Sequence, residues 1–215
     1  TEKTESYYVT VKRKVEKPEA SLIPLVCSGD SLNDCKEMQG LSLKNVKISI
    51  KNQADKVLYA DLGEMMFAHF GVTGPVILSA SAHLENQDIS TLTLSIDLKP
   101  ALDEKTLDAR LLSDFSKKSN KDLISSLGDL LPSKMIEPFI SLSGVDGRKK
   151  VNSITKEERM SLLKTFKSFD IPLDGYRPIE EAIITRGGIE VKEISPKTME
   201  SKILPGLYFA GEIID

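Results

Sequence analysis

The clearest strand pattern in the chain is carried by Leu41-Ser42-Leu43-Lys44-Asn45-Val46-Lys47-Ile48-Ser49-Ile50. Two leucines alternate with polar residues in its first half, and a valine and two isoleucines then alternate in the opposite phase. A phase change inside one strand is what a β-bulge produces, because one extra residue returns the apolar side chains to the same face. The pattern predicts a half-buried strand with a bulge at Lys44-Asn45.

Other segments on both sides of this stretch also have the composition and alternation of strands. A polar turn at 52–55 predicts that the segment 57–62 pairs with it as a hairpin. The remaining predicted strands cover residues 7–11, 22–26, 92–98, 169–173, 181–185, 189–191 and 206–210.

Between residues 102 and 168 the apolar spacing changes to that of helices. Leucine and phenylalanine recur every four residues, Ser133 is predicted as an N-cap, and Thr155-Lys156-Glu157-Glu158 has the form of a capping box. Four short helices are therefore expected here. The order of β-rich, helical and β-rich segments predicts an α+β fold, one β domain that carries a helical insertion.

Composition excludes several classes of protein. The 29 basic and 32 acidic side chains give a net charge of −3, so we expect no nucleic-acid partner, and the lysines of the helical region are interpreted as a solvated face. No apolar run approaches the ~20 residues that span a bilayer, so no membrane contact is expected, and the N-terminal residues lack the apolar stretch of a signal peptide. The absence of an initial Met and the apolar C-terminal run suggest a fragment of a longer protein.

The chain has only two cysteines and two histidines. Cys27 and Cys35 are interpreted as free thiols of a reducing cytoplasm, because disulfide scaffolds are short and dense in cysteine. No spacing of these residues matches a zinc motif, so no metal site is predicted.

Two glycine-containing segments are candidates for a site. In Phe70-Gly71-Val72-Thr73-Gly74-Pro75, a Gly-containing loop leads into a short apolar helix. Either the first N–H groups of this helix bind a ligand, or the loop is only a tight turn from strand to helix. His69 precedes this loop and is either an acid–base residue or a packing residue. In Thr185-Arg186-Gly187-Gly188, the glycines allow close approach by a ligand or another backbone, or form a β-turn, and Arg186 offers a fork to an anion.

A third candidate lies at the C-terminus, where Pro205-Gly206-Leu207-Tyr208-Phe209-Ala210-Gly211-Glu212 reads as an apolar strand that ends on a glycine and an acid. Glycine lets a backbone close on a ligand, and a carboxylate accepts hydrogen bonds from hydroxyl groups.

These segments together resemble the BaiN/YhiN-type bacterial flavoproteins, NAD(P)/FAD-dependent oxidoreductases also described as aminoacetone-oxidase-like. The resemblance covers roughly residues 20–215 and rests on four motifs in order: Leu22-Ile23-Pro24-Leu25, the segment 63–75, Thr185-Arg186-Gly187-Gly188-Ile189, and the segment 196–212. The family's Gly-x-Gly-x-x-Gly motif is absent from this sequence, and Lys14-Val15-Glu16-Lys17 replaces a Gly-rich stretch, so the origin of that junction stays open.

The resemblance implies a translation-factor-like β-barrel with an inserted helical subdomain, flanked by remnants of a Rossmann-type FAD domain. Its borders would be 1–17 and 196–215 for the FAD-domain segments, 18–101 and 169–195 for the barrel, and 102–168 for the helical subdomain. It further implies that Gly187, Gly188, Gly211, Glu212 and Asp215 approach the cofactor. His69, Thr73 and Arg186 would face the cleft for a small-molecule substrate and are the catalytic candidates.

The leading hypothesis is thus the insertion region of an FAD-dependent oxidoreductase, which caps the flavin and shapes the substrate pocket. We expect FAD, with NADH or NADPH, in the intact parent, and neither cofactor nor activity in the 215-residue chain alone. The alternatives are a β-barrel module that binds a protein or RNA partner, and a structural domain. Substrate and oligomeric state are not predicted.

Overall fold

A computed structural model describes residues 15–215 of the chain, so the predicted strand at 7–11 lies outside the described residues. The chain divides into two compact units, one of which joins Val15–Ser21 to Ile183–Asp215, while the other spans Leu22–Ala182. None of the helices in the described part of the chain is long and apolar enough to cross a membrane.

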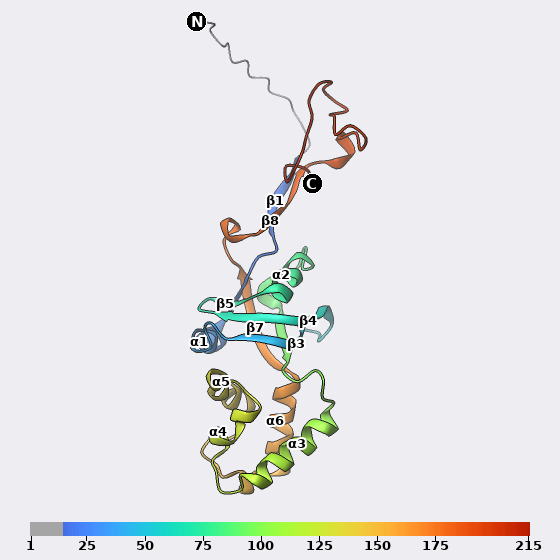
Figure 1. Cartoon of the computed structure of the whole chain (residues 1–215). Coiled ribbons are helices and arrows are strands. Elements are labelled where there is room, and N and C mark those ends of the chain that lie inside the picture. The colour runs from blue at the N-terminus through green and yellow to red at the C-terminus, as the bar shows by residue number, and fades with distance from the viewer. Residues whose placement is uncertain (1–14) are drawn as a thin grey trace, which may run out of the picture. The chain divides into compact units, whose positions relative to one another are not determined.

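The unit Leu22–Ala182 is built on a closed antiparallel β-barrel, as the family resemblance implies (Figure 1). Its strands follow one another around the barrel in the order β2-β5-β4-β3-β6-β7. Their bounds are β2 Leu25–Cys27, β3 Ser42–Lys51, β4 Val57–Ala68, β5 Gly71–Thr73, β6 Thr93–Asp97 and β7 Phe169–Tyr176. Two helices, α1 Gly29–Glu37 and α2 Pro75–Ala82, and the 3-10 turn η1 Ile89–Thr91 connect the strands. Closure leaves no free edge on which another chain could add a strand.

The predicted bulge in β3 is confirmed. Leu43 pairs with Met65 on β4, and the next pair is Val46 with Gly63, so β3 advances by three residues while β4 advances by two. The extra residue restores the apolar side chains to the barrel interior, where Leu43 and Val46 are both buried. The turn after β3 is also confirmed, because the Asn52 side chain accepts hydrogen bonds from the backbone N–H groups of residues 54 and 56.

The helical region enters between β6 and β7, which are neighbours in the barrel (Figure 1). It contains α3 Glu104–Lys117, α4 Leu123–Ser126, η2 Leu127–Asp129, α5 Ser133–Ser143, η3 Val151–Ser153 and α6 Lys156–Lys167. The capping box at Thr155 is present with both of its hydrogen bonds. Ser133 is not the N-cap that the sequence suggested but the first residue of α5, because Pro132 takes the extended cap position.

Barrel and helical region share one hydrophobic core rather than forming two. The Phe139 and Phe166 rings, on α5 and α6, lie 4.4 Å apart between centroids and are fully buried. Lys167, at the end of α6, donates to the carbonyls of Lys99 and Leu102 and pairs with Asp97 at 2.6 Å. Both apolar packing and polar contacts therefore hold the helices against the barrel.

The unit made of the two end segments is a two-stranded antiparallel ribbon followed by irregular chain. β1 Val15–Ser21 pairs with β8 Ile184–Ile189, and Ile189, Ile194 and Phe209 form a small core. In sequence, the 3-10 turn η4 Ile179–Glu181 precedes β8 and belongs to the barrel unit, and η5 Val191–Glu193 follows β8 and belongs to the ribbon unit.

Two expectations differ from the structure in this region. The segment Thr185-Arg186-Gly187-Gly188 is not a β-turn, because β8 runs straight through it to pair with β1. The predicted strand at 206–210 makes only the single bridge of Glu200 with Tyr208. The last barrel strand ends at Tyr176 and the compact barrel unit at Ala182, and the next strand, β8, pairs with β1; the domain borders expected from the sequence stay predictions.

Candidate functional site

The loop before α2 is shaped by a glycine that cannot be replaced without displacement of the backbone. Gly74 is the N-cap of α2, with φ +102°, and Pro75 takes the first helical position. A Cβ atom on Gly74 would lie 2.8 Å from the Cα atom of Met65 on β4. The glycine is thus required by the close approach of two backbone segments. Thr73, half-buried on β5, pairs with Met66.

His69 lies in a small cluster at one end of the barrel, between β4 and β5. Its exposed ring contacts the Phe70 ring edge to face, with centroids 5.1 Å apart. The guanidinium of Arg177 lies over the Phe70 ring, 4.4 Å from its centroid. Arg177 also donates two hydrogen bonds to Glu181, at 3.0 and 2.5 Å.

Within this cluster, the charges of Arg177 and Glu181 neutralise each other. The Arg177 hydrogen bonds hold the pKa of Glu181 below its ordinary value, and His69 contributes to the same shift through its charge. The cluster therefore offers an imidazole and an aromatic face beside a neutralised ion pair. Sequence reasoning named His69 but missed Arg177 and Glu181, which follow β7 and are brought to Phe70 only by barrel closure.

The second candidate segment lies on the β1–β8 ribbon. Arg186 donates to Glu19 of β1 at 3.1 and 2.5 Å, and this contact lowers the pKa of Glu19. Gly187 and Gly188 have φ of +85° and +139°. A Cβ on either would collide with backbone, that of Lys17 for Gly187 and that of Ile213 for Gly188.

The two glycines therefore allow backbone to approach on both sides of β8. Ile189 completes this packing, since its N–H donates to the Ile213 carbonyl at 2.8 Å and its carbonyl accepts from the Asp215 N–H at 3.1 Å. This arrangement brings three of the predicted cofactor residues together: Gly187, Gly188 and Asp215. A role for them in cofactor binding stays a prediction.

The other two predicted cofactor residues lie on an exposed turn. Gly211 has φ +77° and open space where a Cβ would stand, and Glu212 is exposed beside it. A shallow cavity of about 380 Å³ lies in the same unit. It is mainly apolar and is lined by Val191, Lys192, Ile194, Pro196, Met199, Lys202 and Ile214. Arg186 and the His69 cluster belong to different compact units.

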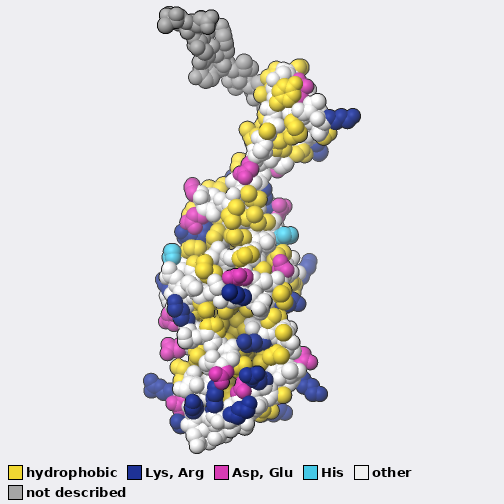
Figure 2. Space-filling model, in the orientation of Figure 1, with side chains coloured by type: hydrophobic (Ala, Val, Ile, Leu, Met, Phe, Trp, Pro, Cys, Tyr) yellow, Lys and Arg dark blue, Asp and Glu magenta, His cyan; other side chains and the backbone are white. Residues whose placement is uncertain are grey.

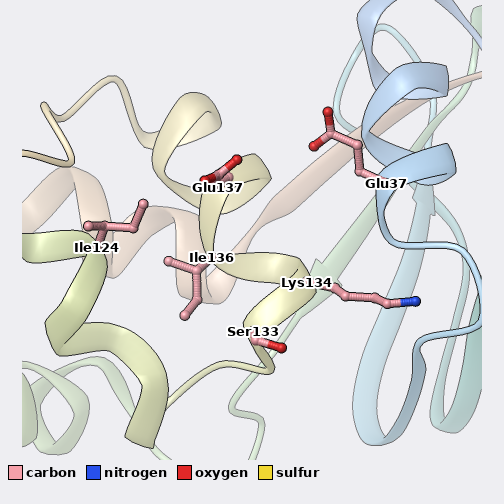
Figure 3. A pocket seen from close by; sticks show the side chains of 6 residues that line it. All are labelled: Glu37, Ile124, Ser133, Lys134, Ile136 and Glu137. Atoms are coloured by element: carbon pink, nitrogen blue, oxygen red, sulfur yellow. The ribbon is translucent and has the colours of Figure 1, made fainter.

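Another cavity, of about 260 Å³, lies in the barrel unit and contains none of the predicted site residues. Figure 3 shows its lining side chains, contributed by α1, α4 and α5, with Lys134 extended toward the segment after α1. The Lys134 amino group donates to the Gln39 carbonyl at 2.8 Å, which ties α5 to the barrel. In residues 15–215, no three histidine, cysteine, aspartate or glutamate side chains gather in a way that could hold a metal ion.

Comparison with known proteins finds relatives among bacterial enzymes. The chain is 26% identical over 196 residues to the ribosomal RNA dihydrouridine synthase of Escherichia coli, and 29% identical over 201 residues to that of Haemophilus influenzae. It is 22% identical over 162 residues to the 3-dehydro-bile acid delta(4,6)-reductase of Clostridium scindens. These alignments cover 91%, 92% and 74% of this chain but 46%, 46% and 40% of the relatives, so the chain spans less than half of their length.

The family assignment follows from the barrel unit itself. Residues 19–184 match the family described as "HI0933-like protein barrel and H2TH domain", and this range coincides closely with the compact unit Leu22–Ala182. The closed barrel and the helices inserted between β6 and β7 agree with that description. The chain belongs to the HI0933-like barrel and H2TH domain family.

Proposed function

We propose that this chain is the inserted region of an FAD-dependent reductase, joined to short segments of the flavin-binding domain that surrounds it. In the intact protein the barrel unit would cap the flavin and shape the pocket for a small-molecule substrate. Two buried free thiols, Cys27 and Cys35, accord with a reducing compartment, so we propose a cytoplasmic location.

The pairing of β1 with β8 carries this proposal. Ser21 pairs with Ile184, so the chain enters and leaves the barrel unit through adjacent residues of one ribbon. Such a connection allows a complete domain to be inserted into another one without disturbing the host fold. Exposed apolar side chains on the ribbon unit, among them Val15, Ile213 and Tyr208, would then pack against the host domain.

The residues of the C-terminal turn fit contact with a flavin better than the paired glycines do. Gly211 leaves open space at its Cβ position, and the Glu212 carboxylate is exposed and able to accept hydrogen bonds from ribityl hydroxyls. At Gly187 and Gly188 the corresponding space is filled by backbone. The chain has no Gly-x-Gly-x-x-Gly motif, so the pyrophosphate would be held by other parts of the parent.

The relatives' names suggest the class of reaction. One names a synthase of dihydrouridine and another a delta(4,6)-reductase, and both describe the addition of hydrogen to a substrate. We therefore propose reduction of a carbon–carbon double bond. The chemistry that FAD would supply is hydride transfer, with NADH or NADPH as the donor. His69, Thr73 and Arg186 remain the candidates for substrate contact.

The test compares the intact parent with the 215-residue chain. Both are purified and desalted, and flavin is measured by absorbance and by chromatography after heat release. We expect a yellow parent, bleached by NADH or NADPH without oxygen, and a folded, colourless chain. A colourless parent would contradict the proposed enzyme class, whereas a chain that keeps flavin would contradict the assignment of the cofactor site to the host domain.

A further inference from the structure

A further cavity of about 260 Å³ lies where the barrel meets the helical region, and we call it the junction cavity. It is lined by residues 42–46 of β3, residues 98–99 after β6, and residues 130–132 and 135 at the start of α5. Figure 2 shows hydrophobic side chains on the visible face between these two parts, with Lys and Arg side chains beside them. The junction cavity contains none of the residues proposed to contact flavin or substrate.

The bulge of β3 forms one side of the junction cavity. Lys44 and Asn45 lie in this bulge and stand opposite a single residue of β4, Glu64. A bulge interrupts the regular alternation of side chains, so both Lys44 and Asn45 are exposed, and both line the cavity. The bulge therefore supplies polar groups at the side of the cavity that is open to solvent.

The walls away from the bulge are apolar. The lining residues Leu98, Leu130, Leu131 and Met135 are at most 8% exposed. Apolar atoms that face an empty space lack the dispersion contacts that a ligand would supply. Cavities with such walls stay dry and take up apolar molecules. An alkyl or aryl group would therefore be bound favourably here.

Lys99 adds a cation that the protein does not neutralise. It is half-buried, and burial together with the nearby charge of Arg110 lowers the pKa of its ammonium group. Arg110 itself pairs with Asp114 at 2.7 Å. The closest acid in sequence, Asp97, pairs with Lys167 at 2.6 Å and accepts the backbone N–H of Lys99 at 2.9 Å. In the described part of the chain, the Lys99 ammonium therefore has no acidic partner.

The backbone around Lys99 is held firmly. The Lys99 carbonyl accepts one hydrogen bond from the Lys167 amino group and one from the Leu102 N–H, each at 3.1 Å. The side chain of Lys99 thus extends from a fixed base.

A cation without a partner beside an apolar wall determines the chemistry of the ligand. A negative group would pair with Lys99, while Lys99 and Arg110 together repel a cationic ligand. A doubly charged group such as phosphate would leave part of its charge uncompensated, because Arg110 already holds Asp114. A singly charged carboxylate with an apolar group attached fits these walls best.

We propose that the junction cavity is a binding site for a small amphipathic carboxylate, whose anionic group pairs with Lys99 and whose apolar part packs against Leu98, Leu130 and Leu131. Because β3 and the start of α5 both line the cavity, a bound ligand would strengthen the contact between the barrel and the helical region. The proposal is independent of flavin chemistry, because none of the proposed cofactor residues takes part in it.

The test measures binding to the 215-residue chain through the NMR shifts of its backbone amides. Octanoate, octanol and octylamine are the probes, because they share one chain length and differ in the charge of the head group. Lys99→Met removes the cation and keeps an unbranched side chain. Lys47→Met is the matched control, because Lys47 is exposed on β3 and does not line the cavity. Asn45→Trp fills the cavity from its open side and leaves Lys99 in place.

We expect octanoate to bind with a Kd of about 1 mM, to shift the amides that line the cavity, and to raise the pKa of Lys99. Octanol should bind about tenfold more weakly than octanoate, and octylamine more weakly still. Lys99→Met should weaken octanoate about tenfold and leave octanol unchanged, whereas Lys47→Met should change neither. Asn45→Trp should prevent binding of both.

The proposal would be overturned if octanol or octylamine bound as tightly as octanoate, because the cavity would then not select an anion. It would also be overturned if octanoate shifted amides elsewhere in the chain, or if both lysine variants lost the same affinity. Circular dichroism and thermal melting verify that each variant is folded. If Lys99→Met did not fold, the effect of Asn45→Trp and the pKa of Lys99 in the unaltered chain would still decide the question.

Discussion

Replacement of Gly74 by alanine tests the argument that β4 and the start of α2 are held together by backbone contact. With φ +102° and ψ 169°, Gly74 lies in a region that only glycine adopts readily. Its Cβ would stand 2.8 Å from the Met65 Cα, 3.1 Å from the Met66 nitrogen and 3.2 Å from the Glu64 carbonyl oxygen. Because these neighbours are backbone atoms of a paired strand, they cannot rotate away.

Two costs add in this variant. The strained dihedral costs about 1–3 kcal/mol, and forcing the strand and helix apart costs about 1–3 kcal/mol more. Gly40 is the matched control, because its φ is +81° but nothing lies within 4 Å of its Cβ position. Gly40→Ala should cost only about 1–2 kcal/mol. The two alanine variants should therefore differ by about 2 kcal/mol in the free energy of unfolding.

Urea unfolding followed by far-UV circular dichroism measures this difference. With a slope of about 2 kcal/mol/M, Gly74→Ala should unfold about 1 M urea earlier than Gly40→Ala. Hydrogen exchange should show the added exposure first in α2 and the facing part of β4. Midpoints that agree within about 0.3 M would refute the reasoning, because crowding by β4 would then add nothing to the cost of a positive φ.

Four further outcomes are expected. Phe166→Ala, which opens a cavity in the shared core, should destabilise the chain by about 3–5 kcal/mol in the same urea assay, and a loss below 1 kcal/mol would contradict a common core. Thr155→Ala removes the capping box and should cost about 1 kcal/mol, with early fraying of α6 seen by hydrogen exchange. The pKa of Glu181 measured by NMR should lie below 4.5 and should rise toward 4.5 in Arg177→Gln. A carboxyl group whose pKa is lower in the folded state stabilises the fold at pH values above its unfolded-state pKa, so this contribution to the free energy of unfolding should disappear as the pH falls below 4.5. The hydrogen bond with Cys35 and burial raise the pKa of the Cys27 thiol, and Cys35 is fully buried, so neither thiol should react with iodoacetamide at pH 8 until the chain is unfolded.

Features that depend on neighbours in sequence were predictable. The β3 bulge follows from one change of phase, the α6 capping box from residues three apart, and the start of α2 from Gly74-Pro75. In each case the physical constraint acts over a few residues: the pleat of one strand, the free N–H groups of one helix end, or the fixed φ of a proline.

Features that depend on closure of the barrel or the ribbon were not predictable in this way. Arg177 and Glu181 reach Phe70 because β7 and β5 both pair with β2, a relation that no local pattern encodes. The segment 206–210 has the composition of a strand but makes only one bridge, since a strand also needs a partner with a matching register. For the same reason, the sequence of β8 does not reveal that its partner is β1 and not a barrel strand.

The glycines show where a sequence pattern stops short of function. A glycine with positive φ indicates that something approaches the backbone, but the pattern is the same whether that neighbour is a ligand or a second chain segment. At 187 and 188 the neighbours are the backbones of β1 and of the C-terminal segment, whereas at 211 the space is open. Gly211→Ala should therefore leave the stability of the ribbon unit nearly unchanged beyond the cost of its φ, and should weaken flavin retention in the intact parent. Gly188→Ala should disrupt the ribbon in the isolated chain, where no flavin is involved. If the flavin lost by Gly211→Ala in the intact parent were fully explained by the fraction of protein that its lower unfolding temperature leaves unfolded, the open space at that turn would not indicate a flavin contact.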